Sequence, residues 1–285
     1  MSLHSVCFGE VLWDLLPNGK QAGGAPMNVA FRLNEFHHKV QLLTAIGKDD
    51  LGKELLEMLK AIQLSNDVHI SDHLPTGTVA VELNDAGNAC YTIVEEVAWD
   101  EIHHFDICPE PFQLIFGSLS LRSNINQASI STLIERASEV VFDINLRKPF
   151  YSFELIDAYI QVSDVIKLNE DELDWLCAQL QIQPVHSITC FLELSKHYPK
   201  KTWCVTLGEK GALLFEKDEL FQSGGFPVQV VDTIGAGDAF LAALLHKRNL
   251  KAHPLECLAF ACKVGSTVAG QRGATQALPK ELLSE

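Results

Sequence analysis

Residues 230–245 read VVDTIGAGDAFLAALL, and this stretch decides how the chain folds. The residues at 226–232 (FPVQVVD) have the pattern of a strand, and residues 238–247 (DAFLAALLHK) have the pattern of a helix. Gly235, Ala236 and Gly237 therefore fall at a strand-to-helix junction. In an open α/β fold such junctions lie beyond the carboxyl ends of the strands, where ligands bind.

The composition of this junction predicts an anion-binding site. Glycine lets the backbone approach a ligand closely and turn its N–H groups toward it, and the positive end of the helix dipole adds to the attraction. Asp238 in the first turn has two interpretations on the residues alone. It caps the helix, or it accepts the proton of a hydroxyl that attacks a phosphoryl group.

Short β-branched runs alternate with helical patterns along most of the chain. This alternation predicts βαβ units, so the expected fold class is α/β, with a mainly parallel sheet in a three-layer α/β/α core. The predicted strands are residues 5–12, 39–46, 114–119, 140–144, 165–168 and 203–207, and predicted helices include 26–36, 50–62 and 125–138.

Residues 76–94 depart from this alternation of strands and helices, because two strand-like runs flank the turn sequence at 84–87 (NDAG). Alternation also runs from residue 11 to 16. These pieces are predicted to pair as a small antiparallel β lid, with an ordinary edge hairpin as the alternative. The expected organisation is a single domain, 1–285, with lid segments inserted at about 11–23 and 75–97.

Composition narrows the classes of partner. The formal net charge of −15 argues against nucleic acid, which requires clustered Lys and Arg. No apolar run reaches the roughly 18 residues of a membrane span, and the first residues lack a signal-peptide pattern. The eight cysteines include no CxxC pair, which favours buried reduced thiols and a cytoplasmic protein.

The stretch DTIGAGDAF closely resembles the C-terminal signature DTxGAGDxF of the ribokinase-like (PfkB-type) carbohydrate kinases. Further segments resemble other elements of that family in the family's order, and together they span residues 9 to 279. They are GGAPMNVA (23–30), IGKDDLGKELL (46–56), KLNEDEL (167–173), VTLGEKGALLF (205–215) and VAGQRGATQALP (268–279).

The resemblance implies roles for the phosphoryl-transfer residues. Asp238 would be the general base, with Gly235, Ala236 and Gly237 as the anion hole. Asn169 and Glu172 would hold the water shell of Mg²⁺, although their spacing equally fits a helix capping box. The resemblance further implies that Thr206, Gly208, Gly211, Thr233 and Gly273 bind ATP, and that Asp232 lies at a monovalent-cation site, usually potassium.

Two segments resemble the fructokinase-like subgroup. GEVLWDLLP is similar to its opening GExLIDxxP, and FDINLRKPFY (142–151) is similar to its DPNLR segment, with Ile144 in place of proline. The substrate-binding residues implied are Asp14, Gly24, Asn28, Asn145 and Arg147.

The sequence thus predicts an ATP-dependent sugar kinase, with fructose as the favoured acceptor. Ribose, a nucleoside and 2-keto-3-deoxygluconate are the alternatives within the family, and a catalytically silent sugar or nucleotide sensor is the alternative outside it. A homodimer formed through the lid is also implied by the resemblance.

Overall fold

The computed structural model describes residues 3–16, 19–64, 67–83, 89–103, 106–107, 111–182 and 187–284. Its strands are β1 His4–Phe8, β2 Leu12–Leu16, β3 Gly19–Gly23, β4 Val40–Gly47, β5 Val68–Ser71, β6 Gly77–Leu83, β7 Ala89–Ile93, β8 Phe112–Gly117, β9 Glu139–Asp143, β10 Val165–Asn169, β11 Thr202–Thr206, β12 Ala212–Glu216 and β13 Glu219–Ser223. Its α-helices are α1 Ala25–Glu35, α2 Asp50–Ala61, α3 Asn124–Ile134, α4 Phe153–Val162, α5 Glu170–Gln179, α6 Ser187–His197, α7 Ala236–Asn249, α8 Pro254–Ala269 and α9 Lys280–Leu283. Short 3₁₀ turns are η1 Ala98–Asp100, η2 Leu119–Arg122 and η3 Gly208–Lys210.

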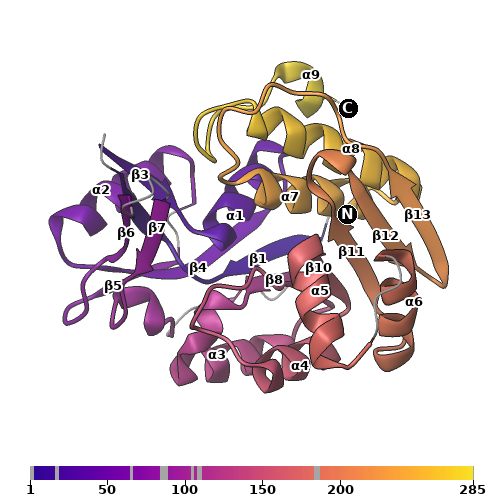
Figure 1. Ribbon diagram of the computed structural model, residues 1–285. Coiled ribbons are helices and arrows are strands. Elements are labelled where there is room, and N and C mark those ends of the chain that lie inside the picture. The colour runs from indigo at the N-terminus through magenta and orange to yellow at the C-terminus, as the bar shows by residue number, and fades with distance from the viewer. Residues whose placement is uncertain are drawn as a thin grey trace.

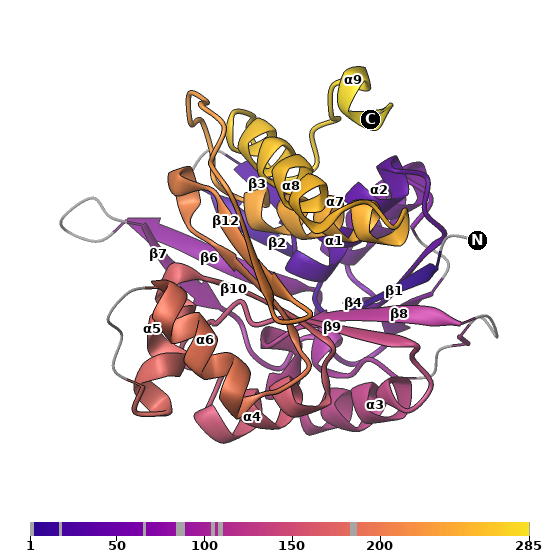
Figure 2. The same ribbon diagram turned by 90° about the vertical axis from the view of Figure 1, so that its right-hand side faces the viewer.

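A nine-stranded sheet lies between two helical layers, with α1, α7 and α8 on one face and α3 to α6 on the other (Figures 1 and 2). The strand order is β13-β12-β11-β10-β9-β8-β1-β4-β5. Every pairing from β11 across to β5 is parallel, and β12 and β13 extend the edge as antiparallel strands. The expected three-layer α/β/α core is confirmed.

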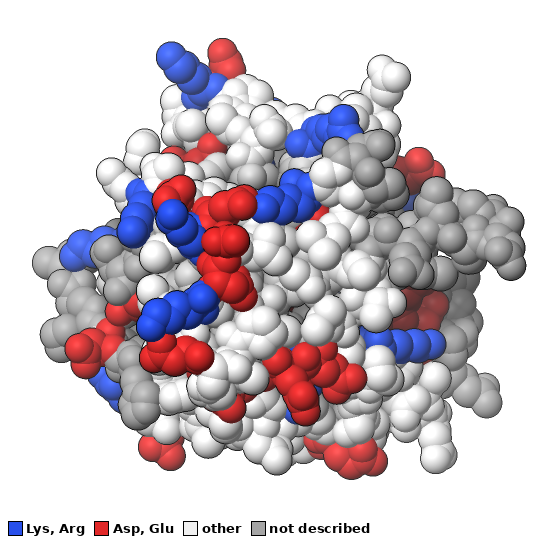
Figure 3. Space-filling model, turned by 90° about the vertical axis from the view of Figure 1, so that its left-hand side faces the viewer, with Lys and Arg blue, Asp and Glu red and all other residues white. Residues whose placement is uncertain are grey.

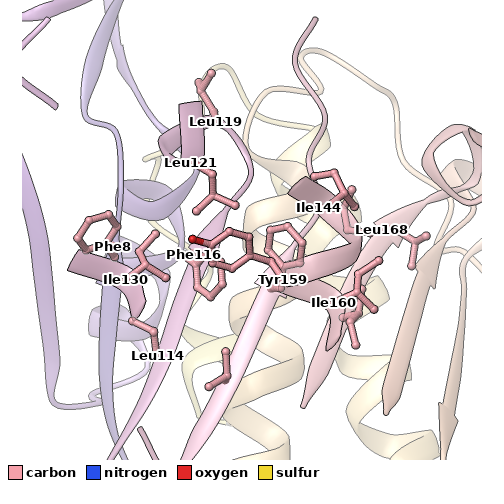
Figure 4. Packing of buried hydrophobic residues seen from close by; sticks show 14 of the residues in the cluster. Phe8, Leu114, Phe116, Leu119, Leu121, Ile130, Ile144, Tyr159, Ile160 and Leu168 are labelled. Atoms are coloured by element: carbon pink, nitrogen blue, oxygen red, sulfur yellow. The ribbon is translucent and has the colours of Figure 1, made fainter. Parts of the chain in front are cut away.

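The core follows from apolar side chains on both faces of the buried strands. Figure 4 shows one cluster, in which Phe116 of β8 packs between strands and the helices below the sheet. The Phe116 and Phe142 rings stack with centroids 5.1 Å apart, and Tyr159 of α4 meets Phe116 edge-on. Such burial on both faces fixes the order of the strands, and therefore where their carboxyl ends meet.

A second sheet has the order β3-β2-β6-β7 and stands to one side of the core (Figure 1). Its β2–β3 and β6–β7 pairs are antiparallel, and β2 pairs with β6 in parallel. All four strands fall within the segments predicted as a lid. The predicted turn at 84–87 lies outside the described residues.

Two strand predictions were wrong. The predicted strand 5–12 is interrupted at Gly9, whose φ of 145° ends β1, and β2 begins only at Leu12. Residues 226–232 form no strand, although Val230 and Val231 are β-branched, because this segment does not pair with β13, the edge strand of the sheet. The N–H groups of Val231 and Asp232 instead donate to Ala269 O at the end of α8.

The cysteines differ in part from the expectation of reduced thiols. Cys7, Cys204, Cys257 and Cys262 are free and buried. Cys177 and Cys190 form a disulfide, so the prediction was wrong for this pair. The cause is that α5 and α6 pack side by side and bring the two Cα atoms to 6.6 Å.

The lid side of the molecule carries basic and acidic side chains close together (Figure 3). Here Lys20 pairs with Glu54 at 2.6 Å and Lys48 pairs with Asp72 at 2.7 Å. Among the described residues, no helix combines the length and the apolar character that crossing a membrane would require.

Candidate active site

The strand-to-helix junction at the start of α7 has the geometry of an anion site. Gly235 adopts the left-handed conformation (φ 76°), and a Cβ there would lie 2.3 Å from Ala274 Cβ, so glycine is required. No side chain caps the first turn of α7. The Ala236 N–H donates to Thr233 O at 3.2 Å, so the remaining N–H groups of the first turn are those that a negatively charged group could engage.

Asp238 lies in that first turn, and its carboxylate is oriented by α1. Asn28 Nδ2 donates to Asp238 Oδ2 at 2.7 Å. Burial and the nearby Asp143 raise the pKa of Asp238 to about 6, against the opposing influence of Lys167, Asn28 and Arg147. At neutral pH the carboxylate is thus ionised but more basic than an ordinary aspartate, which suits proton acceptance.

A buried ion pair beneath the junction was missed by the sequence reasoning. Lys167 on β10 and Asp143 on β9 are register partners, and Lys167 Nζ lies 2.9 and 3.0 Å from the two Asp143 carboxylate oxygens. A Cβ on Gly237 would lie 3.3 Å from Lys167 Nζ, so the ammonium stands directly behind the anion site. Burial lowers the pKa of Lys167, but Asp143, Glu172 and Asp238 outweigh it, and the net pKa is raised.

Asn169 and Glu172 form a capping box at the start of α5, as one of the two interpretations predicted. Asn169 Oδ1 accepts from Glu172 N, and Glu172 Oε2 accepts from Asn169 N, both at 2.9 Å. Glu172 Oε1 also accepts from Leu146 N at 2.8 Å. Burial raises the pKa of Glu172, and Lys167 lowers it.

The metal interpretation is compatible with this capping. The polar side chain of Asn169 is exposed at the carboxyl end of β10, and Glu172 places a carboxylate just behind it. Oxygen-bearing groups of this kind suit Mg²⁺ that keeps most of its water. Within the described part of the chain, no group of three or more His, Cys, Asp or Glu could itself hold a metal ion.

Asp14 projects from the lid sheet, where β2 and β3 set it directly opposite Gln21. Burial raises the pKa of Asp14 to about 6; the charge of Arg147 lowers it and that of Asp232 raises it. These effects show that Asp14, although it belongs to the lid sheet, lies close enough to Arg147 and Asp232 of the core to interact with their charges. Gly24 follows β3 with φ 119° and lies so close to the Glu10 backbone that a Cβ would meet Glu10 O at 2.2 Å.

Glu10 is a second residue that sequence reasoning missed. It is 3% exposed, and its Oε1 accepts from Ala25 N at 3.3 Å. Burial raises its pKa to about 7, opposed by backbone hydrogen bonds and Arg147 and reinforced by Asp238. The signal was present in the motif GEVLWDLLP, but a strand predicted through residue 12 hid the break between β1 and β2 in which Glu10 lies buried.

The segment after β9 carries Asn145 and Arg147, which the sequence predicts to bind the sugar. Asn145 adopts φ 39°, and its carbonyl accepts from Ser118 Oγ at 3.2 Å. Ile144, which replaces the proline of the family pattern, is fully buried. Arg147 is exposed, and its guanidinium donates to Leu146 O at 3.1 Å, so its charge acts on Asp14 and Asp238 without a direct carboxylate contact in the structure.

A cavity of about 630 Å³ lies between the β11–β12 hairpin and the helices α7 and α8. Its walls include the predicted nucleotide-binding residues Thr206, Gly208, Gly211 and Thr233, together with Gly237 of the anion site. The apolar side chains of Phe226, Val228 and Phe240 form a further wall. A cavity of this size and polarity suits a nucleotide whose phosphates point toward α7.

Gly273, predicted on the nucleotide side, is not among the residues that line this cavity. It lies on the loop after α8 with φ 81°, where a Cβ would meet Gln21 Nε2 at 2.1 Å. Its N–H donates to Asp232 Oδ2 at 3.0 Å, and Asp232 Oδ1 accepts from Ile234 N at 3.0 Å. Asp232 therefore ties the loop before α7 to the loop after α8, and the lid touches the second of them.

Comparison with known proteins agrees with this geometry. The family described as "pfkB family carbohydrate kinase" matches residues 8–281. A fructokinase of Solanum tuberosum is 28% identical over 305 residues, covering 97% of this chain and 92% of that protein.

Two solved structures resemble the fold over nearly the whole chain. Fructokinase from Vibrio cholerae O395, with fructose, ADP and calcium bound, is 25% identical with a TM-score of 0.86, covering 99% of this chain and 98% of its own. Aminoimidazole riboside kinase from Salmonella enterica is 23% identical with a TM-score of 0.82, covering 99% of each chain. The second likeness shows the fold alone.

Proposed function

The chain belongs to the pfkB family of carbohydrate kinases, which makes it an ATP-dependent phosphotransferase acting on a sugar hydroxyl, and on that premise we propose fructose as its favoured acceptor. The γ-phosphoryl group of ATP would pass to a primary hydroxyl of the sugar. Fructokinases are among the relatives and the structural neighbours, and the motifs around Asp14 and Arg147 resemble the fructokinase-like subgroup.

The observation that carries the mechanism is the contact between Asn28 and Asp238. Because Asn28 Nδ2 donates to Asp238 Oδ2 at 2.7 Å, Asp238 Oδ1 is the oxygen that would accept the proton of the attacking hydroxyl. A positioned general base typically contributes 10²–10⁴-fold to rate. The raised pKa of about 6 supports this role, since the base is ionised and still accepts a proton well at neutral pH.

Charge on the transferred group would be stabilised from two sides. The N–H groups at Gly235 and Gly237 would face the phosphoryl oxygens, while the Ala236 N–H is bonded to Thr233 O in the structure. The Lys167 ammonium would add positive charge from behind Gly237. This arrangement explains how a protein with a net charge of −15 binds ATP, because the positive potential is local.

Mg²⁺ would be held through water by Asn169 and Glu172, and it would neutralise charge on the ATP phosphates. The capping box fixes both side chains before any metal arrives, which favours a defined water shell. A potassium ion would be held mainly by backbone carbonyls of the two loops that Asp232 ties together.

The sugar would lie between the core and the lid, contacted by Asp14, Gly24, Asn28, Asn145 and Arg147. Lid segments 11–23 and 75–97 would exclude water that otherwise hydrolyses ATP. We further propose that the protein acts in the cytoplasm and that its lid sheet mediates a homodimer, which light scattering tests directly.

The exposed guanidinium of Arg147 favours one second candidate, a sugar acid such as 2-keto-3-deoxygluconate. A carboxylate on the substrate would find in Arg147 a cation that touches no carboxylate among the described residues. Fructose carries no carboxylate with which Arg147 could pair.

The test is ADP release by purified protein with Mg·ATP and one acceptor at a time: fructose, ribose, 2-keto-3-deoxygluconate, adenosine or none. Fastest turnover with fructose supports the proposal. Faster turnover with the sugar acid replaces fructose by the second candidate, and release independent of any acceptor contradicts the kinase mechanism.

A further inference from the structure

Among the described residues of the candidate active site, two buried acceptor atoms have no hydrogen-bond partner: Glu10 Oε2 and Asn28 Oδ1. Buried acceptors are nearly always paired, so an orphan in a binding site indicates a donor that arrives with the ligand. We propose that Glu10 is an additional sugar-binding residue, which pairs through Oε2 with one hydroxyl of the acceptor sugar. This inference rests on the sugar kinase function proposed above.

Glu10 occupies the crossing between the core and the lid. The chain leaves the core after β1, passes Glu10, and enters the lid strand β2. It returns from β3 through Gly24, and there Ala25 N donates to Glu10 Oε1 at 3.3 Å. The side chain therefore bridges the outgoing and returning segments and is fixed where the sugar would lie.

The Glu10 carboxyl group lies within electrostatic reach of the candidate reacting groups. Glu10 interacts electrostatically with Arg147 and with Asp238, the proposed base. Asn28, which carries the second orphan acceptor, follows Ala25 by one helical turn and holds Asp238. Both orphan atoms thus lie near the first turn of α1, beside the carboxylate that would activate the sugar.

The hydrogen bond to the first N–H of α1 uses only one of the two Glu10 carboxylate oxygens. The bond from Ala25 N uses Oε1, and nothing in the described structure uses Oε2. Burial raises the pKa of Glu10 to about 7, so the protonated and ionised forms coexist near neutrality. In the ionised form, Oε2 is an acceptor for the O–H of a sugar hydroxyl, and this is the bond that the proposal requires.

The experiment measures sugar binding directly by calorimetry, using whichever acceptor of the panel above the wild type phosphorylates fastest. Glu10→Gln keeps an oxygen for Ala25 N but replaces Oε2 by an amide that cannot accept, and Glu10→Met removes both. We expect sugar Kd to rise roughly ten- to a hundredfold, with Kd for ATP unchanged.

Asp164→Asn is the matched control. Asp164 Oδ2 also accepts from a single backbone N–H, that of Val140 at 2.8 Å, but at the amino end of the sheet, opposite the site. The same acid-to-amide change there is expected to leave sugar Kd at the wild-type value.

A set of monodeoxy analogues separates contact from structural support. If Glu10 binds one hydroxyl, the Glu10→Gln penalty disappears for the analogue that lacks it and persists for the others. An equal penalty for every analogue, or no penalty with the parent sugar, overturns the proposal. A wild-type protein that binds and phosphorylates no acceptor overturns the proposed function, and this inference with it.

Discussion

Asp238→Asn is predicted to abolish most activity and at the same time to stabilise the fold. Burial raises the pKa of this carboxyl from 3.8 in the unfolded chain to about 6. The folded state therefore tolerates the ionised form poorly, and the neutral amide removes that cost while its Oδ1 still accepts from Asn28. Turnover should fall by roughly 10²–10⁴-fold, because the base is lost.

The size of the stabilisation follows from the two pKa values. A shift of this size corresponds to about 3 kcal/mol at pH 7, where the carboxylate is ionised in both states. For an acid with a raised folded pKa, this cost is absent below pH 3.8 and builds as pH rises to about 6. At pH 5 the difference between variant and wild type should have fallen to about 1.6 kcal/mol.

Urea unfolding of both proteins at pH 7 and pH 5, with turnover measured in parallel, checks the reasoning. Asp164→Asn serves again as the control and should keep its activity and gain no stability. A variant of Asp238 that retains turnover refutes the general base. One that is less stable than wild type at pH 7, or equally stabilised at both pH values, refutes the account of burial.

Four further changes probe the surroundings of the base. Lys167→Met should lower kcat by roughly 10²–10³-fold and the free energy of unfolding by about 3–5 kcal/mol, because Asp143 is left buried and unpaired. Adding Asp143→Leu should restore stability in urea but not turnover. Retained turnover in the single variant would remove Lys167 from the mechanism. Glu172→Gln should raise the Mg²⁺ concentration for half-maximal activity by roughly tenfold, and an unchanged titration would contradict the metal role. Gly273→Ala should raise KM for the sugar, because its Cβ would lie 2.1 Å from Gln21 Nε2 of the lid, and an unchanged KM would show that this contact is irrelevant to closure. Burial lowers the pKa of His246 to about 4, so the stability of the fold should decrease as pH drops from 6.5 toward 4. In thermal melts, His246→Phe should weaken this dependence of Tm on pH. An unchanged dependence would show that other groups cause it.

The layers of the fold were predictable because each strand and helix carries its own periodicity. The β10 and β11 strands end within one residue of the predicted limits, and each is buried on both faces. The segment at 226–232 shows the limit of that reasoning. Its β-branched residues describe a preference, but a strand forms only if it pairs with a neighbouring strand. Here the N–H groups of Val231 and Asp232 bond to Ala269 O at the end of α8 instead.

The site was predictable where a motif is local and less so where two segments meet. The anion site and the capping box are each contained in one short stretch, and their geometry follows from spacing. Lys167 and Asp143 both lie within quoted motifs, yet their ion pair depends on the register of β9 against β10. Glu10 required knowledge of a break in the strand at Gly9 that a continuous strand pattern conceals.

Helix α1 explains why residues so distant in sequence act at one place. Along its length Ala25 meets Glu10 at the lid crossing and Asn28 meets Asp238, while Arg32 donates to Ala274 O and Gln276 O at 2.6 and 2.7 Å. Ala274 in turn packs against Gly235 of the anion site. Because a helix is stiff over two turns, a shift of its first residue displaces the partner of the base and the clamp on the loop together. The lid crossing, the proposed base and the proposed anion site are therefore held in one geometry by a single rigid element.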